Sequence, residues 1–335
     1  MVMGARYHAG MDHTTGGSRT DRRALLAALV TVVLWASAFV SIRASAEHFH
    51  PGVLALGRLL TASIALGVIF LIKGGTLPDR RAWPGILASG VLWFGVYMVA
   101  LNWGEQLVDA GTAAMVVNIG PVVIALLSGW LLKEGFPPML LAGMGVSFLG
   151  AAVVGWSMSG HGSSSVTGVL LCLLAAVTYG GGVVAQKPAL RYASPLQVTT
   201  FGCFAGTVAC LPFSGLMLQE LPKAPWSATL NLLYLGLFPT ALAFSTWAYA
   251  LARTSAGKLG ATTYAVPAVV VAISWVWLGE VPGSLTLLGG VICLAGVAVS
   301  RLPGRRKAAP EDTPGDAPEL RRPDGERTPS GTTTD

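Results

Sequence analysis

The sequence predicts an all-α polytopic membrane protein with ten transmembrane helices, arranged as two inverted five-helix repeats. Of its 335 residues, 53% are hydrophobic and 11% are charged, whereas a soluble chain carries about 25% charged residues. Ten hydrophobic segments each come near the roughly 20 residues that a helix needs to cross a bilayer. The second half of the chain also matches the first half about 146 positions earlier.

The ten segments form two units between polar ends. They cover residues 24–43, 51–72, 82–103, 109–132, 138–157, 166–186, 195–218, 226–250, 256–278 and 284–301. Lipid offers open backbone groups no hydrogen-bond partner, so each segment is expected to be a helix. The units are 24–157 and 158–302, and the polar stretches 1–23 and 303–335 are expected to be disordered cytoplasmic tails. The first stretch lacks a small-residue cleavage site, so no removable signal peptide is expected.

The internal match is clearest around two prolines. Pro121, followed by Glu134, has counterparts 146 positions later in Pro267 and Glu280. Earlier in the units the offset is 144. An odd number of spans in each unit forces the second unit to cross the membrane in the opposite sense. Inverted repeats around a midplane site are typical of secondary transporters, because two mirror-related halves can open the site to either side.

Charged residues indicate which loops face the cytoplasm. Basic residues concentrate in alternate loops: Lys73, Arg80, Arg81, Lys133, Lys187, Arg191, Arg253 and Lys258. The opposite loops hold Lys223 and most of the acidic residues: Glu47, Glu105, Asp109, Glu220 and Glu280. Since positive loops stay cytoplasmic, both termini are predicted to lie in the cytoplasm and the protein in the cell (inner or plasma) membrane.

Arg58 is the charge that lies deepest in a predicted span. It follows Pro51 by seven residues, which is about 10 Å along a helix. A charge at such depth is costly and usually faces a cavity or a partner. Arg58 is therefore either a contact for an anion or carboxylate, or a structural arginine that bonds helix ends and extends outward. No Asp or Glu falls inside a predicted span, which argues against a buried glutamate that exchanges protons for a cationic drug.

Two prolines are expected to kink their spans. Proline removes a backbone hydrogen bond and clashes with the preceding turn, and the freed carbonyls of Pro121 and Pro267 can face a central cavity. The alternative is a packing kink without a ligand. Glu134 and Glu280 lie at repeat-equivalent span ends, where capping of the next turn is the favoured interpretation.

Aromatic and polar side chains gather in the first, third, fourth, sixth, eighth and ninth spans. They would line a cavity that suits a neutral or zwitterionic solute with an apolar part. The candidate substrate-binding residues are Trp35, Ser37, Phe39, Arg58, Tyr97, Asn118, Pro121, Tyr179, Gln186, Trp247, Tyr264 and Pro267.

The sequence contains no constellation typical of an enzyme. It has no Walker loop, no GxSxG and no HExxH motif. Its four cysteines form no CxxC pair, and its histidines lie in tails or short loops, so no metal and no cofactor are expected. The basic residues follow the pattern of a membrane protein, so no nucleic-acid partner is expected.

Several motifs resemble those of the EamA-type drug/metabolite transporters. Trp35 to Phe39 reads WASAF, like that family's W-G/A-S-x-F opening, and Pro51 with Arg58 resembles its P-x-x-x-x-x-x-R. The family's longer signature has an opening glycine or threonine, a proline, a glutamate and two further glycines. It is matched by Gly111, Pro121, Glu134, Gly143 and Gly150, and again by Gly257, Pro267, Glu280 and Gly296.

This resemblance implies two inverted EamA units around a central cavity, and the transport of small metabolites, amino acids among them. The entry motif of the second unit departs from the family, because Tyr179 is followed by three glycines and Gly202 stands near the repeat position of Arg58. No binding role is carried over to those glycines.

The favoured function is a secondary transporter, more specifically an exporter, of small organic metabolites such as amino acids, working by alternating access. The alternatives are a membrane-embedded lipid-modifying enzyme and a proton-coupled drug efflux protein. The expected partners are a small-molecule substrate and the lipid bilayer. The sequence leaves open the substrate, the direction of flux, ion coupling and the choice between monomer and homodimer.

Overall fold

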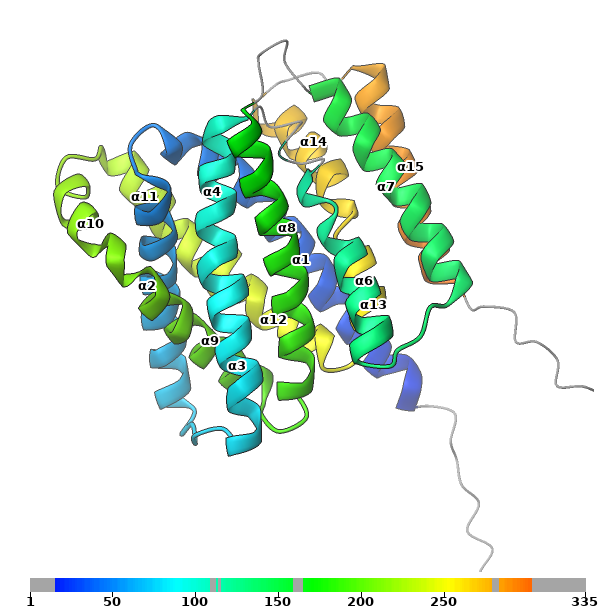
Figure 1. Cartoon of the computed structure of the whole chain (residues 1–335), viewed down its shortest axis with the longest axis horizontal. Coiled ribbons are helices and arrows are strands. Elements are labelled where there is room, and N and C mark those ends of the chain that lie inside the picture. Colours follow the sequence, from blue (N-terminus) through cyan, green and yellow to red (C-terminus); the bar gives the residue numbers. More distant parts are fainter. Residues whose placement is uncertain (1–15, 109–112, 114–115, 159–164, 279–282, 303–335) are drawn as a thin grey trace, which may run out of the picture. The chain divides into compact units, whose positions relative to one another are not determined.

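The computed structural model describes residues 16–108, 113, 116–158, 165–278 and 283–302. Within these ranges the chain forms helices and no strand (Figure 1). The predicted tails at residues 1–15 and 303–335 lie outside the described residues, as do Asp109, Gly111 and Glu280.

The helices of the first half follow one another with short connections. They are α1 (Gly16–Ala46), α2 (Pro51–Ile72), η1 (Arg80–Ala82), α3 (Trp83–Ser89), η2 (Gly90–Val96), α4 (Tyr97–Leu107), α6 (Gly120–Leu131) and α7 (Pro138–Met158). α1 begins at Gly16, so residues 16–23 are helical where a disordered tail was expected.

The second half repeats the pattern of long and interrupted helices. Its elements are α8 (Val166–Ala189), α9 (Pro195–Cys210), η3 (Leu211–Phe213), α10 (Ser214–Glu220), α11 (Trp226–Leu235), η4 (Gly236–Leu242), α12 (Ala243–Leu251), α13 (Ala256–Thr262), α14 (Ala265–Leu278) and α15 (Ser284–Ser300).

Seven helical stretches of the described chain are long and apolar enough to cross a membrane. They are Arg22–Phe39, Pro51–Ile72, Arg80–Leu107, Pro138–Ser157, Val166–Ala189, Pro195–Glu220 and Trp226–Leu251. Two shorter apolar helices, Gly120–Leu131 and Ser284–Ser300, accompany them. A bilayer accepts such segments because a helix satisfies its own backbone hydrogen bonds, and the chain is therefore a polytopic membrane protein.

The third of these stretches corrects a prediction about Glu105. The span was expected to end at residue 103, with Glu105 in a loop, but α4 continues to Leu107. Glu105 is half-buried in the last turn of α4, inside a long apolar helix. Glu105 is therefore helical and not in a loop, and the helix ends four residues beyond the predicted span.

Two long helices each contain a turn of π-helix, which the sequence did not predict. η2 and η4 begin at Gly90 and Gly236, which are 146 positions apart. Both glycines allow close helix contact: a Cβ on Gly90 would lie 2.8 Å from the carbonyl oxygen of Gly202, and a Cβ on Gly236 would lie 2.9 Å from that of Arg58. Such wider turns re-aim the side chains that follow them and often occur at functional sites.

Pro121 and Pro267 begin helices instead of bending them. Pro121 is the second residue of α6, and Pro267 is the third residue of α14, after a turn at Thr263 and Tyr264 that ends α13. The missing N–H of proline costs little in the first helical turn, where backbone donors lack helical partners anyway. The expected kinks are therefore helix breaks.

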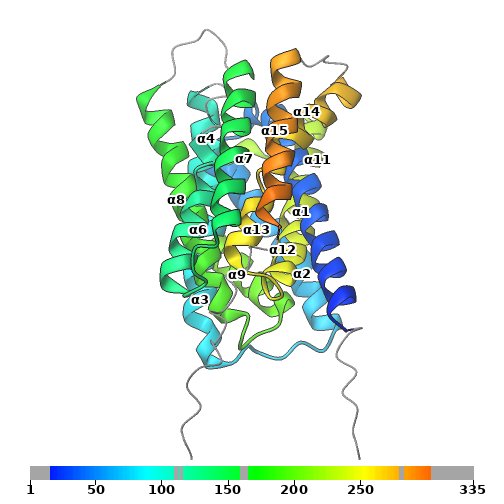
Figure 2. The ribbon, with the colours of Figure 1, turned by 90° about the vertical axis from the view of Figure 1, so that its right-hand side faces the viewer.

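Small residues bring helices from the two halves together. α7 and α15 lie side by side (Figure 2), and a Cβ on Gly143 would lie 2.3 Å from the backbone nitrogen of Ser300. Between them Ser147 Oγ donates to the carbonyl oxygen of Cys293 at 3.0 Å, and Cys293 Sγ donates to that of Ser147 at 3.5 Å. Ser147 and Cys293 are 146 positions apart, and each donates to the backbone of the other.

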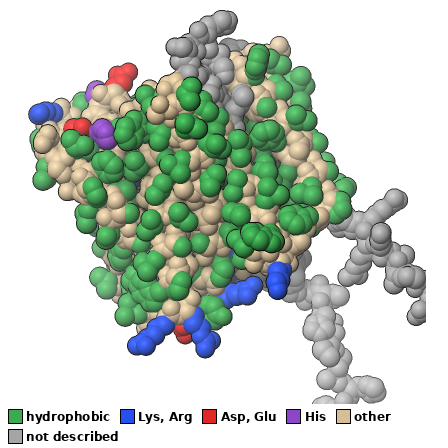
Figure 3. Space-filling model, in the orientation of Figure 1, with side chains coloured by type: hydrophobic (Ala, Val, Ile, Leu, Met, Phe, Trp, Pro, Cys, Tyr) green, Lys and Arg blue, Asp and Glu red, His purple; other side chains and the backbone are tan. Residues whose placement is uncertain are grey.

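The sides of the helices are hydrophobic, and charges gather at the ends. Figure 3 shows hydrophobic side chains over the visible face, Lys and Arg along the lower edge, and acidic and histidine side chains at the upper left. We call the end with the basic loops the basic end; its loops carry Lys73, Arg80, Arg81, Lys133, Arg191, Arg253 and Lys258.

Candidate functional site

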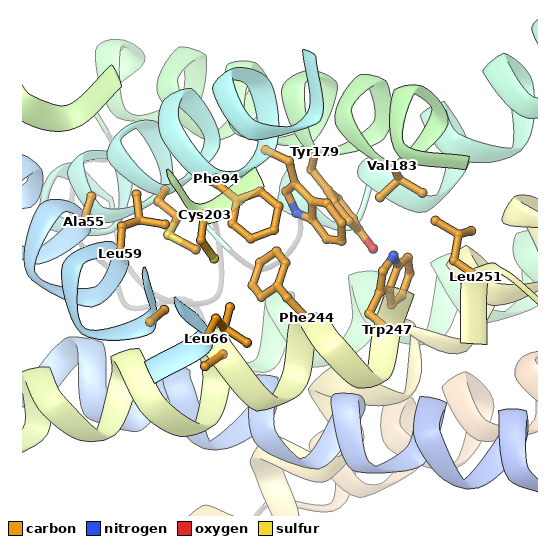
Figure 4. Close-up of a cluster of buried hydrophobic side chains, with 14 of the residues drawn as sticks. Ala55, Leu59, Leu66, Phe94, Tyr179, Val183, Cys203, Phe244, Trp247 and Leu251 are labelled. Atoms are coloured by element: carbon orange, nitrogen blue, oxygen red, sulfur yellow. The ribbon is translucent and has the colours of Figure 1, made fainter. Parts of the chain in front are cut away.

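Seven aromatic rings from four parts of the chain meet in the core. We call them the aromatic cluster: Trp35, Trp93, Phe94, Tyr97, Tyr179, Phe244 and Trp247. Trp35 lies on α1, and the ring centroid of Trp247 on α12 is 5.0 Å from it. Trp93 in η2 is 4.6 Å from Phe244. Figure 4 shows Phe94, Tyr179, Phe244 and Trp247 converging from different helices.

The cluster has a closed side and a more open side. Trp93 and Trp247 are each 1% exposed, whereas Trp35 and Tyr97 are half-buried. Ring contacts at 4.5–7 Å stabilise such a cluster beyond the simple burial of area. Trp35 and Tyr97 are therefore the partly accessible rings of the cluster.

Polar atoms in the cluster are buried without good hydrogen bonds. Among the described residues, Trp247 Nε1 has no hydrogen-bond partner, and the Tyr179 hydroxyl lies near Thr263 without forming a bond of normal geometry. An unpaired buried donor costs free energy. These two donors can therefore bond to a polar group of a ligand at little cost.

Arg58 lies beside the aromatic cluster. It is 5% exposed on α2, and its Nη2 donates a long 3.4 Å hydrogen bond to Thr240 Oγ1 in η4. Its Nε has no partner among the described residues. Tyr97, a member of the cluster, and Glu105 are near enough to interact with it electrostatically. A guanidinium group offers five N–H donors in a planar fork that matches a carboxylate, and the Nε donor of Arg58 is unused among the described residues.

The π-turn in α11–α12 places Thr240 toward Arg58. Thr240 is fully buried, and its hydroxyl donates to the carbonyl oxygen of Leu235 at 2.7 Å, five residues back. The Leu235 oxygen lacks its usual helical donor, because the residue four positions later in the wide turn is Pro239, which has no N–H. The Thr240 oxygen is thereby fixed as an acceptor for Arg58.

The structure brings five of the predicted site residues together around the aromatic cluster. Those in one contiguous group are Trp35, Arg58, Tyr97, Tyr179 and Trp247. Ser37 is bonded elsewhere, because its hydroxyl contacts the Tyr234 hydroxyl at 2.7 Å. Phe39 packs with the apolar residues between α1 and α14, a group that Trp35 also borders.

The remaining predicted residues lie near the helix breaks or farther along α8 than Tyr179. Asn118 is half-buried in the turn before α6, next to buried Pro121, and Pro267 is buried in α14. Tyr264 is fully buried with Ala261 and Cys293, and its hydroxyl lacks a partner among the described residues. Gln186 is fully buried on α8, and both ends of its amide lack such a partner.

The predicted site residues did not include Trp93, Phe94, Phe244 and Thr240, which the structure places at the site. Phe244 lies three residues before Trp247, so the two share one helix face, and that spacing could have indicated it. Trp93 lies in the same span as Tyr97, but its direction depends on the π-turn that the sequence did not reveal.

The comparisons with known proteins agree with this architecture. A family model described as the EamA-like transporter family matches residues 22–156 and again residues 166–302. A "Probable terminal-alkyne amino-acid exporter" of Streptantibioticus cattleyicolor is 39% identical over 88% of this chain and 98% of its own length. A "Probable amino-acid metabolite efflux pump" of Salmonella typhimurium is 26% identical over 82% of this chain and 93% of its own.

The fold also has a counterpart among solved structures. A protein of known crystal structure superimposes with a TM-score of 0.71 and 22% identity, covering 85% of this chain and 99% of that chain. At this identity the likeness concerns the fold alone. The names of the relatives support a small-molecule exporter as the general function. The chain belongs to the EamA-like transporter family and is a multi-pass membrane transporter, not an enzyme.

Proposed function

We propose that the protein exports small amino acids and related metabolites by alternating access. Arg58 binds the substrate carboxylate, and the aromatic cluster binds an apolar or unsaturated side chain. The observation that carries this proposal is a buried arginine whose Nε donor is unused and which interacts electrostatically with Tyr97 of the aromatic cluster. The relatives named as amino-acid exporters favour the same substrate class.

The substrate exchanges ring–ring contacts for ring–substrate contacts. The rings now pack against one another, for example Trp35 with Trp247 at 5.0 Å. A flat or apolar group that enters from the side of Trp35 and Tyr97 keeps aromatic faces covered while it separates them. Tyr179 and Trp247 then donate their unpaired hydrogen bonds to the polar part of the substrate.

We further propose ten membrane spans in two inverted units, 24–157 and 158–302, with both termini in the cytoplasm. One family model matches twice, and the π-turns lie at positions 146 apart. Reciprocal contacts such as Ser147 with Cys293 favour a two-fold relation between the units. On this arrangement the basic end faces the cytoplasm of the inner or plasma membrane.

A proton-coupled drug efflux protein is the second candidate, because Glu105 lies within a long apolar helix. Glu105 interacts electrostatically with Arg58. Opposite charges close together compensate each other and suit a zwitterion better than a cationic drug. Flux driven by the gradient of the solute itself is therefore the favoured mechanism.

Purified protein in proteoliposomes tests the function directly. We expect counterflow of labelled neutral amino acids with apolar or unsaturated side chains, and none of their decarboxylated amines. Transport of the amines at equal rates would contradict a carboxylate site at Arg58. Uphill accumulation driven by an imposed pH gradient alone would favour the proton-coupled candidate.

Topology is tested separately with single cysteines. A cysteine at exposed Lys223 is expected to react with an impermeant thiol reagent in intact cells, and one at exposed Lys258 only after lysis. The reverse pattern would overturn the orientation and leave the site proposal untouched.

A further inference from the structure

At the basic end, a turn and the short helix after it are bonded by charged side chains from three other parts of the chain. The turn joins α12 to α13 and runs from Leu251 to Gly257. Glu134, just after α6, accepts hydrogen bonds from the backbone nitrogens of Ala256 at 2.9 Å and Gly257 at 3.3 Å. Its carboxylate thus satisfies two of the N–H groups that a helix start leaves without partners.

The other end of the turn is bonded by a lysine. Lys187, on α8, donates from Nζ to the carbonyl oxygens of Leu251 and Thr254. Leu251 is the last residue of α12, where backbone oxygens lack helical partners and a cation is favourable, and Thr254 lies in the turn itself. Glu134 and Lys187 therefore hold opposite ends of one turn, the acid on its amides and the base on its carbonyls.

A third contact fixes the helix that follows the turn. Arg301, directly after α15, donates from Nη2 to Thr262 Oγ1 at the end of α13, at 2.7 Å. Hydrogen bonds with a charged partner are about twice as strong as neutral ones. We call Glu134, Lys187 and Arg301, with the turn and the helix that they bind, the corner latch.

The corner latch lies beyond an apolar layer that borders the aromatic cluster. The layer consists of Ile124, Val183, Leu251 and Leu259, each at most 2% exposed. Figure 4 shows Val183 and Leu251 next to Tyr179 and Trp247. Leu251 belongs both to the layer and to the latched turn. Movement of the turn therefore moves the layer.

The latch also joins the two segments that the family model matches. Glu134 lies in the first segment, residues 22–156, and the turn that it binds lies in the second, residues 166–302. α6 packs along α13 in the same region, with a Cβ on Gly260 only 3.2 Å from Ile124. A relative movement of the two segments at the basic end must therefore break the bonds of Glu134.

We propose that the corner latch is the gate that closes the substrate path at the basic end and opens in each transport cycle. This inference rests on the proposed function insofar as it requires a path through the aromatic cluster. The described conformation is closed at that end, since charged contacts and a buried apolar layer lie between the cluster and the basic loops. Glu134 and Lys187 act as positioning residues and touch no substrate.

The test measures how fast a buried cysteine reacts from the basic end. The native cysteines are replaced (Cys172→Ala, Cys203→Ala, Cys210→Ala, Cys293→Ser), and Val183→Cys is introduced into the apolar layer. An impermeant methanethiosulfonate reagent is applied to each side of sealed vesicles without substrate. A separate Lys258→Cys protein, exposed at the basic end, identifies which vesicle side that end faces.

Slow labelling is expected in the parent protein and faster labelling in the latch variants. Glu134→Ala and Lys187→Met should each raise the rate from the basic end about tenfold, as expected when charge-assisted hydrogen bonds that favour the closed state are lost. Glu134→Gln and Lys187→Arg should give intermediate rates because they keep part of the bonding. Lys258→Gln, a charge loss in α13 next to the turn whose side chain makes no latch contact, should leave the rate unchanged.

The outcomes separate the latch from the proposed function. Fast labelling in the parent protein, or unchanged rates in all four latch variants, would overturn the latch. Should the Ala or Met variant fail to reach the membrane, the rates of Glu134→Gln and Lys187→Arg decide. Raised labelling without any amino-acid flux in proteoliposomes would keep the latch and reject the proposed substrate class.

Discussion

Helices α2 and α9 contact each other through a matched pair of hydroxyls, but they carry different residues at the position where the substrate is expected to bind. Ser63 on α2 and Thr207 on α9 are 144 positions apart, and their hydroxyls are 2.9 Å from each other. Five residues earlier on each helix stand Arg58 and Gly202, also 144 apart. Arg58 turns toward η4, whereas Gly202 packs its backbone against the ring of Phe94.

This difference indicates how an internally repeated scaffold can hold an asymmetric site. The paired hydroxyls and the close helix contacts depend on small residues in both halves. The charge occurs in one half only, and the other half uses its equivalent position to support the aromatic cluster from behind. A zwitterion with one carboxylate and one apolar side chain needs that asymmetry, because its two ends differ.

Loss of the charge is expected to have the largest effect. Arg58→Ala should reach the membrane at normal levels and lower amino-acid flux about 10- to 100-fold, because a charge-assisted contact made to the substrate is lost. Arg58→Lys should recover little, since a point charge does not replace a planar fork of donors. Initial rates in proteoliposomes measure this, and normal flux in Arg58→Ala would show that the arginine is structural.

At the Gly202 position of α9, the other half of the comparison, the backbones of neighbouring helices must lie close together. Gly90→Ala should lower the apparent unfolding temperature and cost about 1–3 kcal/mol of stability, because the new Cβ would lie 2.6 Å from the Ala205 Cβ and 2.8 Å from the Gly202 oxygen. Gly145→Ala is the matched control, since no atom lies within 4 Å of its Cβ. Thermal unfolding in detergent measures both, and equal stability of the two variants would contradict close packing behind the cluster.

The sequence predicted the family and the long helices because their signals are local. Twenty apolar residues in a row, as in Pro51–Ile72, require no knowledge of neighbours. The family resemblance, drawn from residues such as Trp35 and Pro121, is confirmed by a match to most of the chain. The ten-span count and the inverted arrangement stay predictions, because the described residues give seven long apolar helices.

What the sequence did not predict depends on tertiary packing. The π-turn at Gly90 directs Trp93 into the core, yet an isolated tryptophan in an apolar segment looks the same whether it faces lipid or protein. Ser37 was a reasonable site candidate until Tyr234, 197 positions away, was found to bond it. Glu105 was expected in a loop but lies in the last turn of α4, because element ends are what a sequence pattern places least well.

A smaller effect is expected for the hydroxyl in the aromatic cluster. Tyr179→Phe should keep or slightly raise stability, because the buried hydroxyl makes no hydrogen bond of normal geometry. It should raise the KM for the amino acid about three- to tenfold if that hydroxyl bonds the substrate. Unfolding temperature and transport kinetics are compared, with Tyr249→Phe as a control outside the cluster. A stability loss with an unchanged KM would assign the hydroxyl to the scaffold.

The smallest effect concerns the contact that the two regions share. In a membrane, a hydrogen bond between helices contributes on average only about 0.6 kcal/mol, because the unfolded state also finds partners. Ser63→Ala and Thr207→Val should therefore each cost little stability, and their coupling in a double-mutant cycle should be about 0.6 kcal/mol.

Flux should be unchanged in both variants, because neither hydroxyl belongs to the aromatic cluster or touches Arg58. A large loss of flux with normal stability would mean that this pair moves during transport, and that α2 and α9 contribute more than a fixed scaffold. The swapped pair, Ser63→Thr with Thr207→Ser, keeps both hydroxyls. It should therefore show the same coupling as the native pair if the two helices are interchangeable at this position.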